Sequence, residues 1–373
     1  MRILVLTIEY PPLGGGASPM AHEINKNYIQ QGHDVEVITM SFRGLPAREI
    51  ADGIIIHRVP CRRSQKHISY PLEHVSFILA ARKFLKRYLP SHSFDVCHGH
   101  FIIPTGILAK WVCRNYKIPF IITAHGSDVP GFNPDRFYLL HKVTPPLLRS
   151  IIKYSSAIVI PSVYLGSLLQ KVLKQPNPKV IHIPNGINTD YFIPGKKEKT
   201  IVSSGRLLDR KGFHLLIKAV SNEDIGYAVH ICGDGPMMAH LKELAAKSCT
   251  QITFHGWIDN RDELYKTLLS QATFYCLVSS NENASTSLME AMSSGCVVIT
   301  SNVSGCPETV GTAGICIPPG NADLLRETLN ALIADQEDQS KLMDAARKRA
   351  IEMYAWTSIT ERYITLLKSS RPK

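Results

Sequence analysis

The chain has 373 residues, of which 45% are hydrophobic and 20% charged, as expected for a globular protein with room for two domains. It contains no apolar run long enough to span a bilayer and no signal peptide at its start, so we expect a cytoplasmic protein. Residues 1–190 hold 22 Lys and Arg against 11 Asp and Glu, whereas residues 191–373 hold 20 of each. The basic first half indicates an anionic partner, which is a phosphate-bearing acceptor, a membrane surface or nucleic acid.

Predicted strands and helices alternate along the first half of the chain. The strands are Ile3–Thr7, Val35–Thr39, Ile54–Val59, Val96–His98, Phe120–Thr123, Ala157–Ile160 and Val180–Ile183. The helices between them are Met20–Gln31, Leu72–Leu89, Thr105–Asn115 and Pro146–Lys153. This alternation predicts a mostly parallel sheet that is covered by helices on both faces.

A turn-rich, charged stretch from Pro184 to Lys199 precedes a second alternation. Its strands are Thr200–Ser204, Ala228–Cys232, Ile252–Phe254, Thr273–Val278, Val297–Thr300 and Gly314–Ile317. Its helices are Gly212–Val220, Pro236–Lys247, Arg261–Leu269, Ser287–Ser293, Ala322–Ala334 and Gln339–Met353. We therefore predict an α/β protein with two doubly wound Rossmann-like domains, residues 1–190 and 191–355, facing each other across a ligand-binding cleft.

Two acids flank a predicted helix start in the second domain. Glu282 comes directly after a strand, and Glu290 lies two turns into the helix that opens with Ser285-Thr286-Ser287. The unpaired N–H groups at a helix start bind phosphate or diphosphate, and carboxylates accept hydrogen bonds from hydroxyls. A diphosphate with sugar hydroxyls on either side describes a nucleotide-sugar.

Basic residues and glycines follow the first strand of each domain. Arg206 and Lys211 flank the turn after Thr200–Ser204, where they would neutralise a diphosphate, although a solvated basic turn has the same pattern. The loop Gly14-Gly15-Gly16 follows strand Ile3–Thr7 and would let backbone approach a phosphate or a sugar. Pro19 stands where the dinucleotide fingerprint needs its third glycine, which disfavours a nicotinamide dehydrogenase.

Further candidate residues stand just after other predicted strands. Gly235, Trp257 and Ile258 lie where a base and a ribose would bind, although the pattern favours a core or rim aromatic for the side chain of Trp257. His125, with Asp128 nearby, is placed to contact a substrate hydroxyl, and a purely structural histidine is the alternative.

The sequence gives no sign of a metal or a bound cofactor. It has no Asp-x-Asp and no completed His/Cys/Asp/Glu cluster, and its nine cysteines lie mostly in apolar runs, which predicts buried thiols.

The predicted helix Leu72–Leu89 has an apolar stripe and an opposite face with Arg82, Lys83, Lys86 and Arg87. Such a helix either covers the sheet or lies on an anionic membrane. No motif favours nucleic acid.

In their order along the chain, these motifs resemble those of the family 4 retaining glycosyltransferases, which have the GT-B architecture. The matching motifs are the glycine loop, Thr123-Ala124-His125-Gly126, Pro184-Asn185-Gly186-Ile187, Gly205-Arg206, Lys211-Gly212, Gly233-Asp234-Gly235-Pro236, Phe254-His255-Gly256 and the Glu282/Glu290 pair. The family usually has a glycine or serine, an aromatic and a glycine after the first glutamate. Here Asn283-Ala284-Ser285 follows Glu282, so the donor sugar stays open.

The resemblance implies roles for the candidate residues. Arg206 and Lys211 would grip the diphosphate, and Glu290 would hold the ribose. His125 and Glu282 would contact the donor sugar, so that His125, Glu282, Arg206 and Lys211 form the catalytic set. Gly15, Gly16 and the backbone of Ser285, Thr286 and Ser287 would add contacts to the donor. The resemblance also implies that residues 1–190 bind the acceptor, that residues 191–355 bind the nucleotide-sugar, and that the final helix, 356–373, packs on the first domain.

These observations predict a retaining, metal-independent glycosyltransferase that uses a nucleoside-diphosphate sugar and acts in polysaccharide or glycolipid biosynthesis of the cell envelope. The expected partners are the donor, a saccharide or lipid-linked acceptor and an anionic membrane surface, with the protein on the inner face of the membrane. A nucleotide-sugar epimerase, a phosphorylase and a non-catalytic binding subunit are the alternatives.

Overall fold

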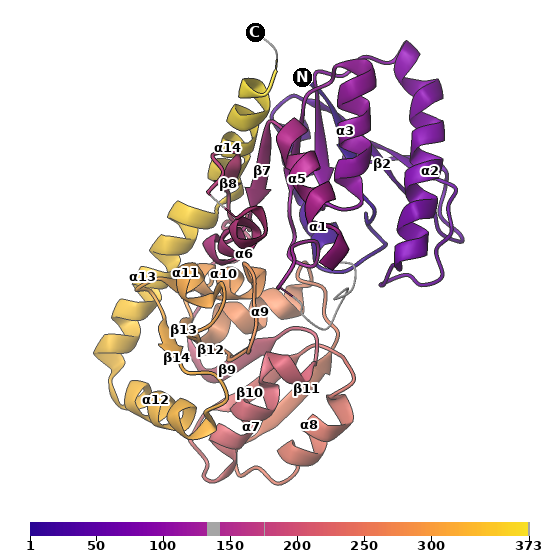
Figure 1. Ribbon diagram of the computed structural model, residues 1–373. Helices are drawn as coiled ribbons and strands as arrows, with labels where there is room; N and C mark the ends of the chain where they lie inside the picture. The colour runs from indigo at the N-terminus through magenta and orange to yellow at the C-terminus, as the bar shows by residue number, and fades with distance from the viewer. Residues whose placement is uncertain (133–141, 175, 372–373) are drawn as a thin grey trace. The chain divides into compact units, whose positions relative to one another are not determined.

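The computed structural model describes residues 1–132, 142–174 and 176–371, which form two compact units (Figure 1). Unit 1 comprises Met1–Ile183 and Thr360–Lys373, and unit 2 comprises Pro184–Ile359. Each unit contains one predominantly parallel sheet with helices on both faces. The prediction of two doubly wound α/β folds is therefore confirmed.

The sheet of unit 1 has eight strands in the order β3-β4-β2-β1-β5-β6-β7-β8. The strands are β1 (Arg2–Leu6), β2 (Asp34–Met40), β3 (Arg48–Ala51), β4 (Ile54–Val59), β5 (Val96–His100), β6 (Phe120–Thr123), β7 (Ala157–Ile160) and β8 (Val180–His182). The helices are α1 (Ala17–Gln30), α2 (Pro71–Tyr88), α3 (Thr105–Tyr116), α5 (Pro145–Tyr154) and α6 (Val163–Leu173), with a 3₁₀ turn at Leu89–Ser91.

Strand β3 and helix α6 are absent from the elements predicted for unit 1. β3 pairs antiparallel with β4 at the edge of the sheet, through a turn at Asp52-Gly53 in which both residues have positive φ. An Asp-Gly pair is a hairpin signal, and it could have revealed this strand, whose own residues are too polar to stand out. α6 begins at a capped N-terminus, because the Ser162 hydroxyl accepts the N–H of Leu165 at 3.0 Å.

The sheet of unit 2 has six parallel strands in the order β11-β10-β9-β12-β13-β14. The strands are β9 (Glu198–Ser204), β10 (Ala228–Cys232), β11 (Ile252–Gly256), β12 (Ala272–Leu277), β13 (Val297–Ser301) and β14 (Ile315–Ile317). The helices are α7 (Phe213–Ser221), α8 (Met238–Ala245), α9 (Glu263–Gln271), α10 (Thr286–Ser293), α11 (Cys306–Val310), α12 (Ala322–Ala334) and α13 (Gln336–Tyr354), with a 3₁₀ turn at Asp209–Lys211.

After β9, the chain adds β10 and β11 on one side of this strand and then adds β12, β13 and β14 on its other side. β9 pairs with β10 on one edge and with β12 on the other, so the strand order reverses between β9 and β12. In open α/β sheets, ligands bind at such a reversal, outside the carboxyl ends of the strands. Two apolar clusters hold the strands in place, one on each face, and they include Val202, Val298 and Leu288 on one side and Ile201, Val229 and Ile299 on the other.

The last helix, α14 (Trp356–Ser369), begins in unit 2 and continues in unit 1. The helix and the residues that follow it contact unit 1 at two points. The Tyr363 hydroxyl lies 3.2 Å from that of Thr123 in β6, and Arg371 forms an ion pair with Asp95 at 2.7 Å. Tyr363 and Leu367 are buried, so this part of the helix belongs to the core of unit 1.

Candidate functional site in unit 2

Glu282 and Lys211 form an ion pair at the point where the strand order of unit 2 reverses. Lys211 ends the 3₁₀ turn after β9, and Glu282 lies in the loop between β12 and α10. The Lys211 ammonium contacts the Glu282 carboxylate, which also accepts the Ser279 hydroxyl at 2.9 Å. Their side chains are only 15% and 9% exposed. The pair therefore places a cation and an acid, each compensated by the other, at the carboxyl ends of the two central strands.

The loop that carries Glu282 is fixed from two sides. The backbone N–H of Gly305 donates to the Glu282 carbonyl at 3.0 Å, and the Asn185 amide donates to the Ala284 carbonyl at 2.9 Å. A Cβ at Gly305 would lie 1.7 Å from the Asn283 carbonyl oxygen, so only glycine fits there. These contacts hold the segment Asn283-Ala284-Ser285, where the sequence departs from the family pattern, in one backbone path.

Helix α10 begins with donors that no capping side chain occupies. Its N-cap is Ser285, and the Ser285 hydroxyl lies 3.1 Å from that of Ser287 and makes no capping bond. The first N–H groups of a helix have no carbonyl four residues back, and the helix dipole is positive at this end. The start of α10, which includes Thr286, is therefore suited to an anion. It comes four residues after Glu282.

Arg206 contributes an exposed guanidinium from the loop that also carries Lys211. It follows β9 directly, and it makes no side-chain hydrogen bond or ion pair with residues 1–132, 142–174 or 176–371. The Lys211 ammonium lies about 4.0 Å from the position that a Cβ on Gly205, the residue before Arg206, would take, so it lies beside the backbone at the start of this loop. Because Glu282 compensates Lys211, the positive charges of this loop that have no acidic partner among the described residues are those of Arg206 and Arg210.

The loops after β9 and β10 pack backbone against backbone. The N–H of Leu207 donates to the Asp234 carbonyl at 2.9 Å, and a Cβ at Gly235 would lie 2.5 Å from the Leu207 carbonyl oxygen. A Cβ at Gly233 would lie 1.9 Å from the Gly205 carbonyl oxygen. The glycines of this motif therefore bring the two loops together, which keeps the backbone beside Arg206 in place.

Glu290 lies on α10 and is buried in a chain of hydrogen bonds. The Asn260 amide donates to one of its oxygens at 2.9 Å, and the Tyr265 hydroxyl donates to the other at 3.2 Å. The chain continues from Tyr265 to the Ser204 hydroxyl at 2.8 Å and from there to Tyr275 at 2.9 Å. Burial raises the pKa of Glu290 to about 7, although both hydrogen bonds act in the opposite direction.

Trp257 and Ile258 follow β11 and have opposite environments. Trp257 is 72% exposed, so its side chain is not part of the core. Ile258 is partly buried and packs against the cluster that contains Tyr265 and Leu288. The Trp257 indole is therefore not a core aromatic, which was one of the roles that the sequence left open.

Unit 1 carries the remaining candidate residues, and two of its histidines, His100 and His125, lie close together. His125 Nε2 lies 3.1 Å from His100 Nδ1, and burial lowers the pKa of His125 to about 4, so the imidazole is neutral near pH 7. Asp128 does not face outward, because its carboxylate accepts the N–H groups of His125, Gly126 and Ile102 at 2.7–3.0 Å. Asp128 therefore fixes the backbone of the His125 loop.

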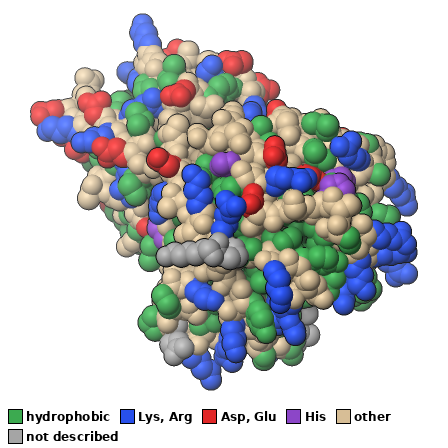
Figure 2. All heavy atoms as spheres, turned by 90° about the horizontal axis from the view of Figure 1, so that it is seen from above, with side chains coloured by type: hydrophobic (Ala, Val, Ile, Leu, Met, Phe, Trp, Pro, Cys, Tyr) green, Lys and Arg blue, Asp and Glu red, His purple; other side chains and the backbone are tan. Residues whose placement is uncertain are grey.

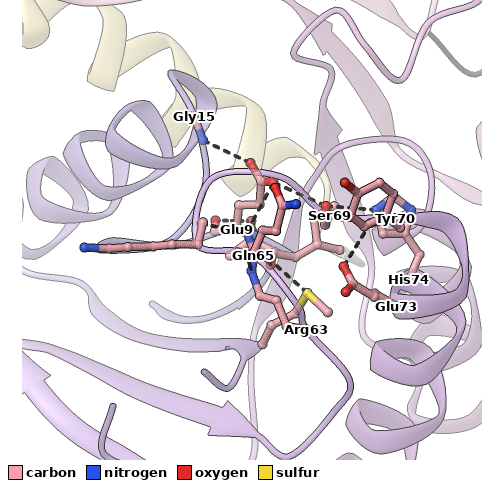
Figure 3. A network of polar contacts seen from close by, with 12 residues as sticks. Glu9, Gly15, Arg63, Gln65, Ser69, Tyr70, Glu73 and His74 are labelled. Atoms are coloured by element: carbon pink, nitrogen blue, oxygen red, sulfur yellow. Dashed lines mark hydrogen bonds and ion pairs between the residues drawn. The ribbon is translucent and has the colours of Figure 1, made fainter. Parts of the chain in front are cut away.

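The glycine loop of unit 1 is occupied by an internal carboxylate (Figure 3). The N–H of Gly15 donates to Glu9 at 3.3 Å, and Glu9 also accepts the Ser69 hydroxyl and pairs with the buried Arg63 guanidinium at 3.7 Å. A Cβ at Gly14 would lie 2.5 Å from the Glu9 carboxylate, whereas nothing lies within 4 Å of a Cβ at Gly16. The acid stands where the sequence predicts an approaching diphosphate.

Sequence reasoning missed several residues that the structure brings to these sites. Asn260 and Tyr265 hold Glu290, Ser279 holds Glu282, and Glu9 fills the glycine loop. Tyr265 belongs to the apolar stripe of α9 and reads as core, and Ser279 stands in a polar loop, so neither has a distinctive local pattern. The sequence signal that could have identified Glu9 is its position just after β1.

Neither a membrane-spanning helix nor a metal cluster is found in the part of the chain that the structure describes. No helix there is long and apolar enough to cross a bilayer, and no group of three or more His, Cys, Asp or Glu side chains could hold a metal ion. The metal independence of the reaction stays a prediction.

Comparison with known proteins identifies the family. Residues 14–191 match the family described as Glycosyltransferase Family 4, and residues 190–349 match Glycosyl transferases group 1. The chain is 27% identical to the uncharacterized glycosyltransferase MJ1607 of Methanocaldococcus jannaschii, over 99% of this chain and 98% of that protein.

Solved structures agree with the fold. Sucrose-phosphate synthase from Thermosynechococcus elongatus superposes with a TM-score of 0.83 at 18% identity, covering 99% of this chain and 98% of that one. HepE of Anabaena in complex with UDP superposes with a TM-score of 0.78 at 16% identity, covering 99% and 100%. The predicted GT-B architecture is confirmed, and the chain belongs to the family 4, or group 1, glycosyltransferases, retaining enzymes that transfer a sugar from a nucleotide-sugar.

Proposed function

We propose that unit 2 binds the nucleotide-sugar at the reversal between β9 and β12. In this proposal the diphosphate lies against the start of α10 and is neutralised by Arg206 and Lys211, while Glu290 accepts the ribose hydroxyls. The observation that carries it is that the Lys211–Glu282 ion pair, the exposed Arg206 and the uncapped start of α10 all lie in loops at the carboxyl ends of β9 and β12. Gly235 and the backbone of Ser285, Thr286 and Ser287 complete the diphosphate contacts, and Trp257 and Ile258 lie on the side of the base.

The Lys211–Glu282 pair suggests how the site changes when the donor binds. A diphosphate beside Lys211 competes with Glu282 for the ammonium, because both are anionic acceptors. Glu282 then accepts a hydroxyl of the donor sugar instead. The pair keeps both charges compensated before the donor arrives, since an unpaired buried charge is costly.

We propose that transfer proceeds on one face of the donor sugar. The acceptor oxygen bonds to the anomeric carbon as the bond to the phosphate oxygen breaks, and the acceptor proton passes to that phosphate oxygen. Arg206 and Lys211 stabilise the charge that develops on the leaving diphosphate. His125 of unit 1, neutral at pH 7, contacts the donor sugar in this proposal, and Gly15 and Gly16 shape the adjoining backbone.

The donor is proposed to be a UDP-sugar, because HepE, which shares the fold, binds UDP. The acceptor is proposed to be a saccharide of a cell-envelope polysaccharide or glycolipid, because residues 1–190 carry the net positive charge of the chain. Incubation of the protein with UDP-sugars and isolated membranes would reveal such an acceptor by transfer of label into the lipid or polymer fraction. Transfer only to small soluble acceptors would contradict the proposal.

The site assignment is tested by comparing variants of two arginines in the same loop, Arg206 and Arg210. R206Q removes the guanidinium assigned to the diphosphate. R210Q removes a guanidinium of the same loop whose hydrogen bond, among the residues that the structure describes, goes to the Asn281 carbonyl at 3.3 Å. We expect R206Q to lower turnover roughly 100-fold, as the loss of one transition-state donor does, and R210Q to leave it nearly unchanged. Equal activity of R206Q and wild type, with intact folding, would rule out the assignment.

A further inference from the structure

The outward face of α2 carries exposed apolar side chains. Leu72, Val75 and Leu79 are 78%, 53% and 63% exposed, and their spacing of three and four residues puts them on one face. The stripe that the sequence singled out packs inward instead, since Phe77, Ala81 and Leu85 are buried. Covering helices normally present polar residues to solvent, so this second apolar stripe is not explained by the fold.

Basic side chains continue and flank the same stripe. Lys83 and Lys86 are exposed and extend the spacing that begins at Leu72, and Arg62 and Lys66 are exposed in the loop before the helix. The N–H of Arg62 donates to the Ser76 hydroxyl at 2.9 Å, which ties this loop to the first turns of α2. Figure 2 shows Lys and Arg side chains gathered along its right-hand side, the side on which α2 lies in Figure 1.

The acids of this region are turned inward (Figure 3). Glu73, the only acid between residues 60 and 92, is buried and accepts the N–H groups of Ser64 and Tyr70 at 2.7 and 3.0 Å. Glu9 pairs with Arg63 in the same network. Both acids are thus engaged by internal donors, and the exposed charged side chains of residues 60–92 are all positive.

We propose that the α2 outer face, defined as Leu72, Val75, Leu79, Lys83 and Lys86, docks on an anionic lipid surface. From Leu72 to Lys86 the stripe is about 21 Å long at the rise of an α-helix. The three apolar side chains would enter the headgroup region, and the lysines would contact lipid phosphates. A nucleic acid would meet the lysines but offers no apolar phase for the leucines and the valine.

The test measures binding of the full chain to vesicles without nucleotide, so its outcome does not depend on the donor site. Vesicles of phosphatidylcholine with one-third phosphatidylglycerol are compared with pure phosphatidylcholine in a flotation assay. We expect binding only to the anionic vesicles, and weakening at high salt. K83Q/K86Q should lower the partition coefficient about 25-fold, at about fivefold per lysine, and L72S/V75S/L79S should lower it at least as much.

Matched control variants lie on α13, which also carries exposed lysines and apolar residues. K341Q/K348Q and I351S/M353S should bind the vesicles as the wild type does. Because the α2 positions are exposed, all variants should retain their thermal unfolding and their nucleotide binding. Equal binding to neutral and anionic vesicles, or undiminished binding by both α2 variants, would overturn the proposal. Binding of a duplex DNA oligonucleotide without vesicle binding would also overturn it.

Discussion

Glu290 provides a quantitative prediction, because its ionisation controls the proposed ribose contact. Burial raises its pKa to about 7, so the carboxyl is largely protonated at pH 6 before the donor binds. A carboxylate accepts hydroxyl hydrogen bonds better than a carboxylic acid does. Donor affinity should therefore increase with pH through about 7 and become constant above about 8.

The size of the effect follows from the fraction ionised. With a pKa of about 7, roughly one-tenth of the molecules carry the carboxylate at pH 6, so the donor should bind about tenfold more weakly there than at pH 8.5. Titration calorimetry with a nucleotide-sugar measures this directly, because its esterified diphosphate does not titrate near neutrality. Binding below pH 7 should also release a proton.

Two variants test the origin of the pH dependence. E290Q cannot ionise, so its affinity should be low and constant between pH 6 and 8.5. Y265F removes the hydroxyl that donates to Glu290 at 3.2 Å and favours its charged form, so the midpoint should move to higher pH. A pH-independent affinity in the wild type, or the same pH dependence in E290Q, would refute the reasoning.

The same pKa predicts how stability changes with pH. The unfolded carboxyl titrates near 4.5 and the folded one near 7, so between these values the folded state binds more protons. The free energy of unfolding should therefore decrease as pH rises through this window, by up to about 3 kcal/mol from this group. Urea unfolding of wild type and E290Q at pH 5 and 8 would show a larger decrease in the wild type.

Further predictions concern the loops around the ion pair. K211M should lower the free energy of unfolding by about 3 kcal/mol, because it leaves the buried Glu282 uncompensated, and double variant K211M/E282Q should recover much of that loss in urea unfolding. A greater instability of the double variant would contradict this. G235A should be destabilising by about 1–3 kcal/mol, since its Cβ would lie 2.5 Å from a backbone oxygen, whereas G16A meets nothing within 4 Å and should change thermal unfolding little. Equal melting temperatures for the two glycine variants would refute the packing argument. R206Q should leave the free energy of unfolding within about 0.5 kcal/mol of wild type despite its loss of activity, because Arg206 is exposed. A large loss of stability in R206Q would instead indicate a structural role for Arg206.

Much of the fold was predictable from the sequence because its strands are buried on both faces. Strands such as β1 and β12 are almost wholly apolar and are bounded by turn residues, which makes their period and limits clear. The edge strand β3 lacks this signal, since only half of it is packed and its stability comes from pairing with β4. Its detection depends on the turn rather than on the strand.

The candidate site was predictable only as far as the chain order of its motifs. Lys211 and Glu282 are 71 residues apart, and their pairing results from the adjacency of β9 and β12 in the sheet. Asn260 contacts Glu290 from the loop after β11, and no local sequence pattern predicts this contact. In the same way, the exposure of Leu72 and the burial of Phe77 depend on which face of α2 meets the sheet.

The most direct test of the account is a crystal structure of the protein with an intact nucleotide-sugar. We expect the diphosphate at the start of α10 with Arg206 and Lys211 bound to its oxygens, the ribose hydroxyls on Glu290, and the contact between Lys211 and Glu282 lengthened. A nucleotide-sugar bound elsewhere in the chain, with the Lys211–Glu282 pair intact and Arg206 still in solvent, would contradict the central claim.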